Sequence, residues 1–308
     1  MSLLVVGTVA FDNIETPFGR ADMVVGGAAT YIALAASYYT RNIKIVSVIG
    51  DDFPEADLDD LRSRGVDLAG LQVKQGEKSF FWAGRYHDDM NGRDTLDTQL
   101  NVLADFDPVL PADYQDAEFV MLGNLTPAVQ MRVLDQLKQE PKLIALDTMN
   151  FWMDTAMDEL KEVIKRIDIL TINDEEARQL SGEHSLVKAA QVIHEMGPRI
   201  LIIKKGEHGA LLFYENEVFF APALPLAEVF DPTGAGDTFA GGLMGYLAST
   251  NDISFENLKR AVVYGSVMAS FCVEKFSTER LKELNDDMIT ERMLRFVQLV
   301  NFDAKLNI

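Results

Sequence analysis

The stretch Asp231-Pro-Thr-Gly-Ala-Gly-Asp237 is a glycine-rich turn between two carboxylates. Asp231-Pro232 favours the start of a turn, because proline fixes its own φ and pushes the preceding residue out of the α region. Gly234 and Gly236 can adopt backbone angles that are closed to other residues. Together with Ala235 they leave almost no side chain to obstruct a ligand. The sequence therefore predicts a tight turn whose backbone is accessible.

A helix follows this turn. Phe239, Leu243 and Leu247 recur at every fourth position, which predicts one apolar face of a helix over 238–248 that begins at Asp237. The first turn of a helix has free N–H groups, and its dipole is positive there. A glycine turn in front of such a helix is the usual backbone arrangement for binding a phosphate.

Asp237 has a simpler interpretation, since aspartate often caps a helix. The second carboxylate at Asp231 and the small turn residues favour an anion site instead. Glycines inside the predicted helix cost up to ~1 kcal/mol each, so they imply that another backbone approaches closely; they are Gly241, Gly242 and Gly245. A dinucleotide fingerprint is excluded by Phe239, and a P-loop is excluded because the chain has no Gly-Lys dipeptide.

The composition of the 308 residues limits the partners. The formal net charge is −20, so nucleic acid and anionic membranes are poor partners. No apolar run approaches the ~20 residues of a membrane span, and no basic signal segment precedes Leu3. The single cysteine, Cys272, excludes a disulfide within the chain. We expect a cytoplasmic protein that creates positive potential locally, from N–H groups, a few cations or Mg²⁺.

Strands and helices alternate along most of the chain, which predicts a parallel sheet covered by helices. Residues 71–103 interrupt this alternation, because their strand-like segments 72–73, 80–85 and 98–102 have no helix between them. We interpret them as a small antiparallel patch inserted into the α/β body. A hairpin about Pro17 and Gly19 is predicted in residues 12–25.

Six motifs in order resemble the ribokinase, or PfkB-type carbohydrate kinase, family. They span residues 3 to about 276 and are Gly7-Thr-Val-Ala-Phe-Asp12, Gly26-Gly27, Val48-Ile-Gly-Asp-Asp52, Asn173-Asp-Glu-Glu176, Ile202-Ile-Lys-Lys-Gly206 with Gly209-Ala210, and Asp231 to Phe239. The resemblance implies one ribokinase-like three-layer α/β/α domain over 1–308, with a mostly parallel central sheet. It also implies a β-lid formed by about 12–25 and 71–103.

The resemblance further implies ATP-dependent phosphorylation of a hydroxyl group. It makes Asp237 the general base, which we expect to stay ionised at the helix start. The backbone of Gly234, Ala235, Gly236 and Asp237 would form the anion hole. The implied contacts are Asp12, Gly26, Gly27 and Tyr31 for the substrate, Asn173, Lys204, Gly206 and Gly209 for the nucleotide, and Glu176 for Mg²⁺ through water.

Three positions depart from the family pattern. Tyr31 stands where an asparagine usually holds the sugar, so it either stacks on a ring or simply packs. Lys204 replaces a threonine or serine and either contacts a phosphate or extends to solvent. The segment from Asp147 to Asn150 lacks the family's arginine. Asp231 and Thr233 match part of a monovalent cation site, so K⁺ is a further expectation.

The sequence leaves three functions open. A sugar kinase comes first, and a nucleoside kinase is the alternative that Tyr31 and the aromatic strand Phe80-Phe81-Trp82 favour. A sugar or nucleotide sensor without catalysis is the third, although the intact Asp237 argues against it. An exposed lid edge would also allow a homodimer through the lid.

Overall fold

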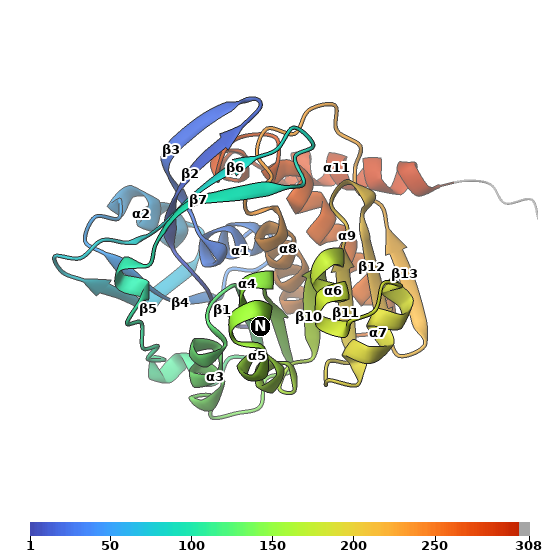
Figure 1. The fold of residues 1–308 in the computed structure, drawn as a ribbon, viewed down its shortest axis with the longest axis horizontal. Coiled ribbons are helices and arrows are strands. Elements are labelled where there is room, and N and C mark those ends of the chain that lie inside the picture. Colours follow the sequence, from blue (N-terminus) through green and yellow to red (C-terminus); the bar gives the residue numbers. More distant parts are fainter. Residues whose placement is uncertain (302–308) are drawn as a thin grey trace, which may run out of the picture.

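A mostly parallel sheet forms the centre of the protein. The computed structural model describes residues 1–301, and within them the sheet has nine strands in the order β13-β12-β11-β10-β9-β8-β1-β4-β5 (Figure 1). All neighbours are parallel except β11–β12 and β12–β13. The strands are β1 Leu3–Val6, β4 Ile43–Gly50, β5 Val66–Lys74, β8 Phe119–Leu122, β9 Leu143–Asp147, β10 Ile169–Asn173, β11 Ile200–Lys204, β12 Ala210–Tyr214 and β13 Glu217–Ala221.

Helices cover both faces of this sheet. In β1, Leu3 and Val5 face one apolar layer while Leu4 and Val6 face the other. The first layer contains α1 Ala28–Ala36, α2 Glu55–Ser63, α8 Ala235–Thr250, α9 Phe255–Cys272, α10 Glu279–Lys282 and α11 Asp286–Val300. The second contains α3 Pro127–Asp135, α4 Asn150–Thr155, α5 Met157–Ile164, α6 Asp174–Ser181 and α7 Leu186–His194. This confirms the predicted three-layer α/β/α fold.

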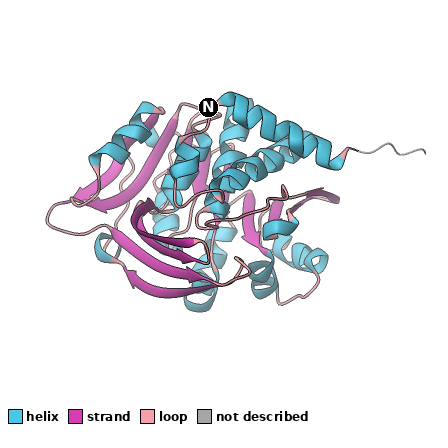
Figure 2. Cartoon of the chain, turned by 90° about the horizontal axis from the view of Figure 1, so that it is seen from above, coloured by secondary structure: helices cyan, strands magenta, loops and turns pink. Residues whose placement is uncertain are grey.

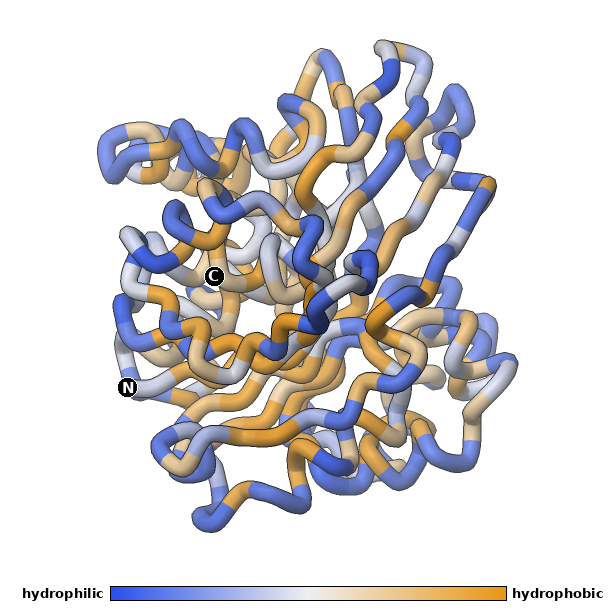
Figure 3. Tube along the Cα trace, turned by 90° about the vertical axis from the view of Figure 1, so that its left-hand side faces the viewer, coloured by the Kyte–Doolittle hydropathy of each residue, from blue (hydrophilic) through white to orange (hydrophobic). Residues whose placement is uncertain are grey.

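The hydropathy of the chain follows these layers. Hydrophobic segments gather along the strands in the middle of the body, and hydrophilic segments lie on the outer helices and loops (Figure 3). Strands such as β1 and β8 are fully buried along their length. Such strands read as continuous apolar runs because a parallel sheet has both faces covered.

A second, four-stranded sheet lies over one side of the body (Figures 1 and 2). Its order is β3-β2-β6-β7, with β2 Ala10–Thr16, β3 Gly19–Gly26, β6 Phe80–Tyr86 and β7 Arg93–Gln99. We call this sheet the lid. The two hairpins β2–β3 and β6–β7 are antiparallel, but they join through a parallel pairing of β2 with β6. The inserted patch is therefore antiparallel within itself, as predicted, and is joined to the first hairpin by one parallel pair.

The bounds of the lid differ from the predicted ones: its first hairpin spans 10–26 rather than 12–25, and its second spans 80–99 rather than 71–103. Residues 71–74 belong to β5, which pairs with β4 at the edge of the main sheet. The last lid strand lies at Arg93–Gln99 rather than 98–102, where a short 3₁₀ helix, η1 Asn101–Leu103, follows it. Every residue of β7 is exposed, so this strand lacks the alternation of apolar residues that identifies a strand in a sequence. The assignment of all 308 residues to one domain stays a prediction.

Glycines in α8 allow three helices to pack closely, as predicted. A Cβ on Gly241 would collide with the Ile32 carbonyl oxygen of α1, and one on Gly245 would lie 2.7 Å from the Ala36 Cα. On the other side, a Cβ on Gly242 would lie 2.9 Å from the Met268 side chain of α9. The helix that follows the glycine turn is thus fixed between α1 and α9. Among residues 1–301, no helix combines the length and apolar character needed to cross a membrane.

Candidate active site

The predicted turn leads directly into α8. Gly234 caps the helix in the left-handed conformation, with φ of 74°, and α8 begins at Ala235, two residues before the predicted start. The Ala235 N–H donates to the Pro232 carbonyl oxygen (3.1 Å). The N–H groups of Gly234, Gly236 and Asp237 have no protein acceptor among residues 1–301. The turn therefore has three free N–H donors among the described residues. Ala235 is not one of them, and its role is to leave room for a ligand.

The side chain of Asp231 stabilises the turn at 231–237 through hydrogen bonds. Its carboxylate is buried and accepts hydrogen bonds from the N–H of Thr233 (2.8 Å) and the N–H of Ser277 (2.8 Å). The Thr233 hydroxyl donates to the hydroxyl of Tyr86 in lid strand β6 (3.1 Å). Burial raises the pKa of Asp231, although these two N–H donors oppose the rise. The turn is thus connected both to the segment after α9 and to the lid.

Asp237 lies half-buried in the first turn of α8. Burial, and then the neighbouring carboxylate of Asp147, raise its pKa to about 7, while Lys204 and Arg93 act in the opposite direction. Asp237 was expected to stay ionised at the helix start, whereas a pKa of about 7 leaves it partly ionised at neutral pH, because burial and Asp147 outweigh Lys204 and Arg93. A group with a pKa near 7 is well suited to accept and return protons at neutral pH.

Lys204 and Asp147 form an ion pair beside the turn. The Lys204 Nζ lies 2.7 Å from the Asp147 Oδ2, and their side chains are 18% and 9% exposed. A Cβ on Gly236 would lie 3.2 Å from the Lys204 Nζ, so the ammonium lies against the start of α8. Burial would lower the pKa of Lys204, but Asp147, Glu176 and Asp237 together raise it above its usual value. Lys204 remains a cation.

Asn173 and Glu176 form a capping box at the start of α6. The Glu176 N–H donates to the Asn173 Oδ1 (2.8 Å), and the Asn173 N–H donates to the Glu176 Oε2 (2.8 Å). Burial raises the pKa of Glu176 to about 7. Lys204 opposes this rise and Asp147 adds to it, so these charges lie near one another.

Asp12 and Gly26 belong to the lid strands β2 and β3 and lie against each other, and Gly27 follows Gly26 in the chain. Asp12 in β2 pairs with Val24, and a Cβ on Gly26 would collide with the Asp12 carboxylate. Gly27, with φ of 92°, connects the lid to α1. Burial, then Asp231 and Asp237, raise the pKa of Asp12 to about 8. The lid thus brings a buried carboxylate toward the turn before α8.

Tyr31 is buried in the core, with 1% of its surface exposed. A Cβ on Gly234 would lie 2.5 Å from its ring, so the ring supports the turn from behind. Its hydroxyl has no hydrogen-bond partner within residues 1–301. Of the two interpretations that the sequence left open, the geometry favours packing over contact with a substrate.

Gly206 and Gly209 form a turn after β11 that includes the 3₁₀ helix η3, Gly206–His208. Both glycines have positive φ, of 54° and 84°. The turn lies close to the tip of the β6–β7 hairpin, because a Cβ on Gly206 would lie 3.2 Å from the Asn91 Oδ1. The lid hairpin therefore reaches from the turn at 231–237 to the turn at 206–209.

Two lid residues at the site were missed by the sequence analysis. Tyr86 and Arg93 are direct partners across the β6–β7 ladder, so their side chains lie on one face of the hairpin. Tyr86 contacts Thr233, and Arg93 influences the pKa of Asp237. A third residue, Asp147, received too little weight because its motif lacks the arginine. The available signal was its place at the carboxyl end of a buried strand.

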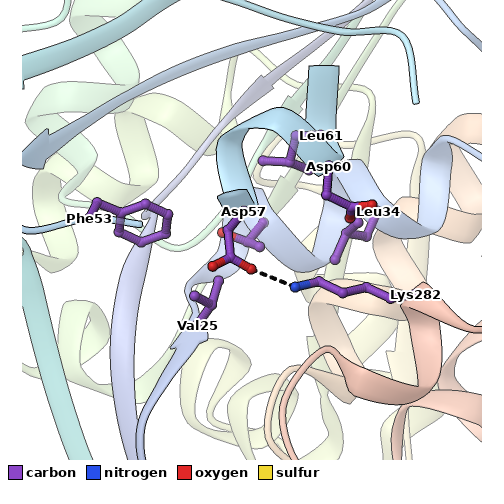
Figure 4. A pocket seen from close by; sticks show the side chains of 8 residues that line it. Val25, Leu34, Phe53, Asp57, Asp60, Leu61 and Lys282 are labelled. Atoms are coloured by element: carbon purple, nitrogen blue, oxygen red, sulfur yellow. Dashed lines mark hydrogen bonds and ion pairs between the residues drawn. The ribbon is translucent and has the colours of Figure 1, made fainter. Parts of the chain in front are cut away.

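A small pocket lies elsewhere, between β3, α1, α2 and α10 (Figure 4). Val25, Leu34, Phe53 and Leu61 line it, and an ion pair between the Lys282 Nζ and the Asp57 Oδ1 (2.6 Å) closes it. None of the predicted site residues lines this pocket. The chemistry is therefore concentrated at the carboxyl ends of β9, β10 and β11 and at the start of α8.

The sequence of residues 4–284 matches the pfkB family of carbohydrate kinases. The chain belongs to this family. It is 32% identical over 253 residues to a cytidine kinase of Thermococcus kodakarensis, covering 80% of this chain and 88% of that protein. It is 27% identical over 308 residues to a nucleoside kinase of Methanothermobacter thermautotrophicus, covering 90% and 91%.

Solved structures of the pfkB family share the fold. A putative ribokinase II from E. coli, in complex with ATP and Mg²⁺, superimposes with a TM-score of 0.78 at 19% identity and covers 97% of this chain and 99% of that one. A Burkholderia thailandensis nucleoside kinase in complex with inosine gives 0.75 at 20% identity, covering 95% and 97%. The pfkB-type chain is thus a small-molecule kinase with a ribokinase-like fold and a lid.

Proposed function

We propose that this pfkB-type kinase transfers the γ-phosphoryl group of ATP to a hydroxyl group of a sugar or sugar-like acceptor. The observation that carries the proposal is the start of α8, where free N–H groups of Gly234 and Gly236 lie beside the carboxylate of Asp237. A base and an anion site are thereby held on one rigid helix. Phosphoryl transfer requires little more than alignment and neutralisation of charge.

Asp237 acts as the general base in this proposal. It takes the proton of the acceptor hydroxyl while the acceptor oxygen forms a bond to the γ-phosphorus. The bond from that phosphorus to the bridging oxygen breaks, and ADP leaves with the electron pair. The N–H groups of Gly234, Gly236 and Asp237 donate to the oxygens of the transferred group, where they are worth most in a site that excludes water.

The residues at the ends of β10 and β11 would hold the nucleotide. Gly206 and Gly209 give an open backbone there, and Lys204 supplies a cation. Glu176 uses one carboxylate oxygen in the capping box, so the other is available to a water of Mg²⁺. No group of three or more acidic, histidine or cysteine ligands exists among residues 1–301. Mg²⁺ keeps several waters and neutralises phosphate charge when bound.

Asp12, Gly26 and Gly27 would bind the acceptor hydroxyls under the lid. Asp12 and Trp82 are direct partners in the parallel β2–β6 pairing, so both side chains lie on one face of the lid. A nucleoside is the second candidate acceptor. The half-buried indole of Trp82 beside Asp12 favours it, because an aromatic ring next to hydroxyl-binding groups suits a base attached to a sugar. The related cytidine and nucleoside kinases support this alternative.

The test is ADP release measured with ATP and Mg²⁺ across a panel of sugars and nucleosides. Turnover with a sugar supports the first acceptor class, and turnover confined to nucleosides supports the second. Asp237→Asn should reduce kcat by a factor of at least about 10² while ATP affinity stays within about twofold, because it removes the base alone. A variant that keeps a tenth or more of the wild-type turnover contradicts the assignment of Asp237. Thermal stabilisation by one compound without any turnover would favour the sensor.

Three further expectations belong to this proposal. A monovalent cation such as K⁺ would lie at Asp231 and Thr233. Both carboxylate oxygens of Asp231 already accept hydrogen bonds from N–H groups, so the proposed reaction does not depend on this cation. A homodimer would form through the lid, whose edge strand β7 is exposed along its whole length. Size-exclusion chromatography at several concentrations tests the dimer. The cytoplasmic location also remains an expectation.

A further inference from the structure

The ion pair between Lys204 and Asp147 bridges the carboxyl end of β10. Asp147 is the last residue of β9 and Lys204 is the last residue of β11, and both strands are neighbours of β10 in the sheet. The 2.7 Å contact between the Lys204 Nζ and the Asp147 Oδ2 therefore joins side chains from two strands that do not touch. The Lys204 and Asp147 side chains are both largely buried, so the ion pair holds the ammonium in place.

Neighbouring carboxylates keep the Lys204 ammonium charged, and free N–H donors also face it. The ammonium lies against Gly236, in the first turn of α8, where the helix dipole is positive and N–H groups are free. Burial of a charged pair also costs free energy that the pair itself repays poorly. Asp147 balances the cation, but it does not use the free N–H donors that the ammonium faces. An anion between Lys204 and α8 would accept hydrogen bonds from the ammonium and from these N–H groups together.

The surrounding charges are otherwise negative. Glu176 and Asp237 both lie close enough to Lys204 to influence its pKa, and Asp12 and Asp231 lie beyond Asp237. These carboxylates repel an incoming phosphate, so a cation is required to offset the repulsion. Arg93 on the exposed strand β7 is the other cation near these groups, and it is carried by the lid rather than by the sheet. Lys204 is the cation that the main sheet holds in place.

We propose that the Lys204 ammonium contacts the transferred phosphoryl group itself, and that Asp147 is a positioning residue that holds it there. This inference rests on the proposed kinase function and sharpens it, because the sequence assigned Lys204 only to the nucleotide as a whole. As the acceptor oxygen bonds to the γ-phosphorus and ADP leaves, charge spreads over the three equatorial oxygens. Lys204 donates to one of them from the side of the sheet, opposite the N–H groups of α8.

The experiment compares two nucleotides that differ in the γ group. Dissociation constants for ADP and for the non-hydrolysable analogue AMP-PNP, each with Mg²⁺, are measured by calorimetry for the wild type and Lys204→Met. We expect ADP affinity to stay within about twofold and AMP-PNP affinity to fall by about 10- to 100-fold, the loss of one charged hydrogen bond. Lys188→Met is the matched control, because it removes the same charge from an exposed position on α7, outside the nucleotide turn, and it should leave both affinities unchanged.

Kinetic measurements test whether Asp147 acts by positioning Lys204. In Lys204→Met, kcat should fall by about 10² or more, as for the loss of one preorganised donor to the developing charge. In Asp147→Asn, kcat should fall while KM for ATP changes less than threefold, and Asp147→Glu should recover part of the loss. A purely structural role would lower the melting temperature without this separation of kcat from KM. The double variant Lys204→Met/Asp147→Asn removes both charges and should bind the nucleotides as Lys204→Met does.

The outcomes separate this inference from the proposed function. If the wild type and Lys204→Met bind AMP-PNP equally well and turn over equally fast, Lys204 does not contact the transferred group, although the chain is still a kinase. If Lys204→Met weakens ADP and AMP-PNP to the same extent, Lys204 contacts another part of the nucleotide and the inference is wrong. If the wild type binds neither nucleotide, the proposed ATP-dependent function fails, and the inference fails with it.

Discussion

Replacement of Asp12 by asparagine should stabilise the protein increasingly as the pH rises. Burial beside Asp231 and Asp237 raises the pKa of Asp12 from 3.8 to about 8. When the pKa of a carboxyl group is higher in the folded chain than in the unfolded chain, the folded chain binds more protons at any pH between the two values. Its contribution is therefore most favourable below pH ~4 and is lost as the pH rises toward ~8, by up to about 1.4 kcal/mol per pH unit.

The magnitude follows from the interval between two measured pH values. From pH 5 to pH 7 the wild type should lose about 3 kcal/mol of unfolding free energy through Asp12 alone, since two units at about 1.4 kcal/mol each separate these conditions. Asparagine has nearly the same shape and does not titrate in this range, so Asp12→Asn lacks this loss. The advantage of the variant over the wild type should grow by about 3 kcal/mol over the same interval.

Urea unfolding at pH 5, 6 and 7 measures this difference directly. The exposed residue Asp105 offers a matched control, because Asp105→Asn removes a carboxylate from the surface. Its stability difference from the wild type should stay within about 0.5 kcal/mol across the range, as for most surface substitutions. A difference for Asp12→Asn that is equally constant from pH 5 to pH 7 would refute the reasoning. Asp12 would then titrate in the folded protein as it does in the unfolded chain.

Three other predictions concern the turn and the helix after it. The kcat/KM of the wild type should fall as the pH drops below about 7, because Asp237 must be deprotonated to act as a base; a flat profile from pH 5.5 to 8 would exclude this. Tyr31→Phe should leave kcat and the acceptor KM within twofold and should not lower the melting temperature, because the buried hydroxyl has no partner among residues 1–301. A KM raised tenfold would place that hydroxyl at the acceptor after all. Gly241→Ala should cost about 1–3 kcal/mol in urea unfolding, because its Cβ collides with the Ile32 carbonyl oxygen; no loss of stability would mean that α1 and α8 can separate there.

The main sheet and the turn were predictable because their signals are local. Apolar runs identify buried parallel strands such as β1 and β8, and the residues from Asp231 to Asp237 specify a turn through proline and glycine alone. The close packing of α8 was also predictable, since interior glycines have no other evident use. In each case the chemistry of a few neighbouring residues determines the local structure.

The lid and the environment of Asp237 were less predictable because they depend on residues far apart in the chain. The exposed strand β7 has no apolar side to reveal it, and the parallel pairing of β2 with β6 has no sequence signal of its own. Desolvation of Asp237 and its proximity to Asp147 arise only when β9 and α8 meet. A helix N-terminus considered alone therefore did not reveal the raised pKa of Asp237.

The lid is connected to the body by four separate passages of the chain. The strands β2 and β3 lie between β1 and α1, and the strands β6 and β7 lie between β5 and η1. Two of these passages are single residues, Gly27 and Leu100. All four passages join the same end of the lid, because Ala10 pairs with Gly26 and with Phe80, and Phe81 pairs with Gln99.

This tethering limits how the enzyme can admit and release its ligands. The lid can rotate about this attached end, away from the turns at 206–209 and 231–237, which is hinge rather than shear motion. Such a rotation leaves the β2–β6 ladder intact, so amide exchange in this ladder should report on unfolding of the lid strands and not on rotation of the lid.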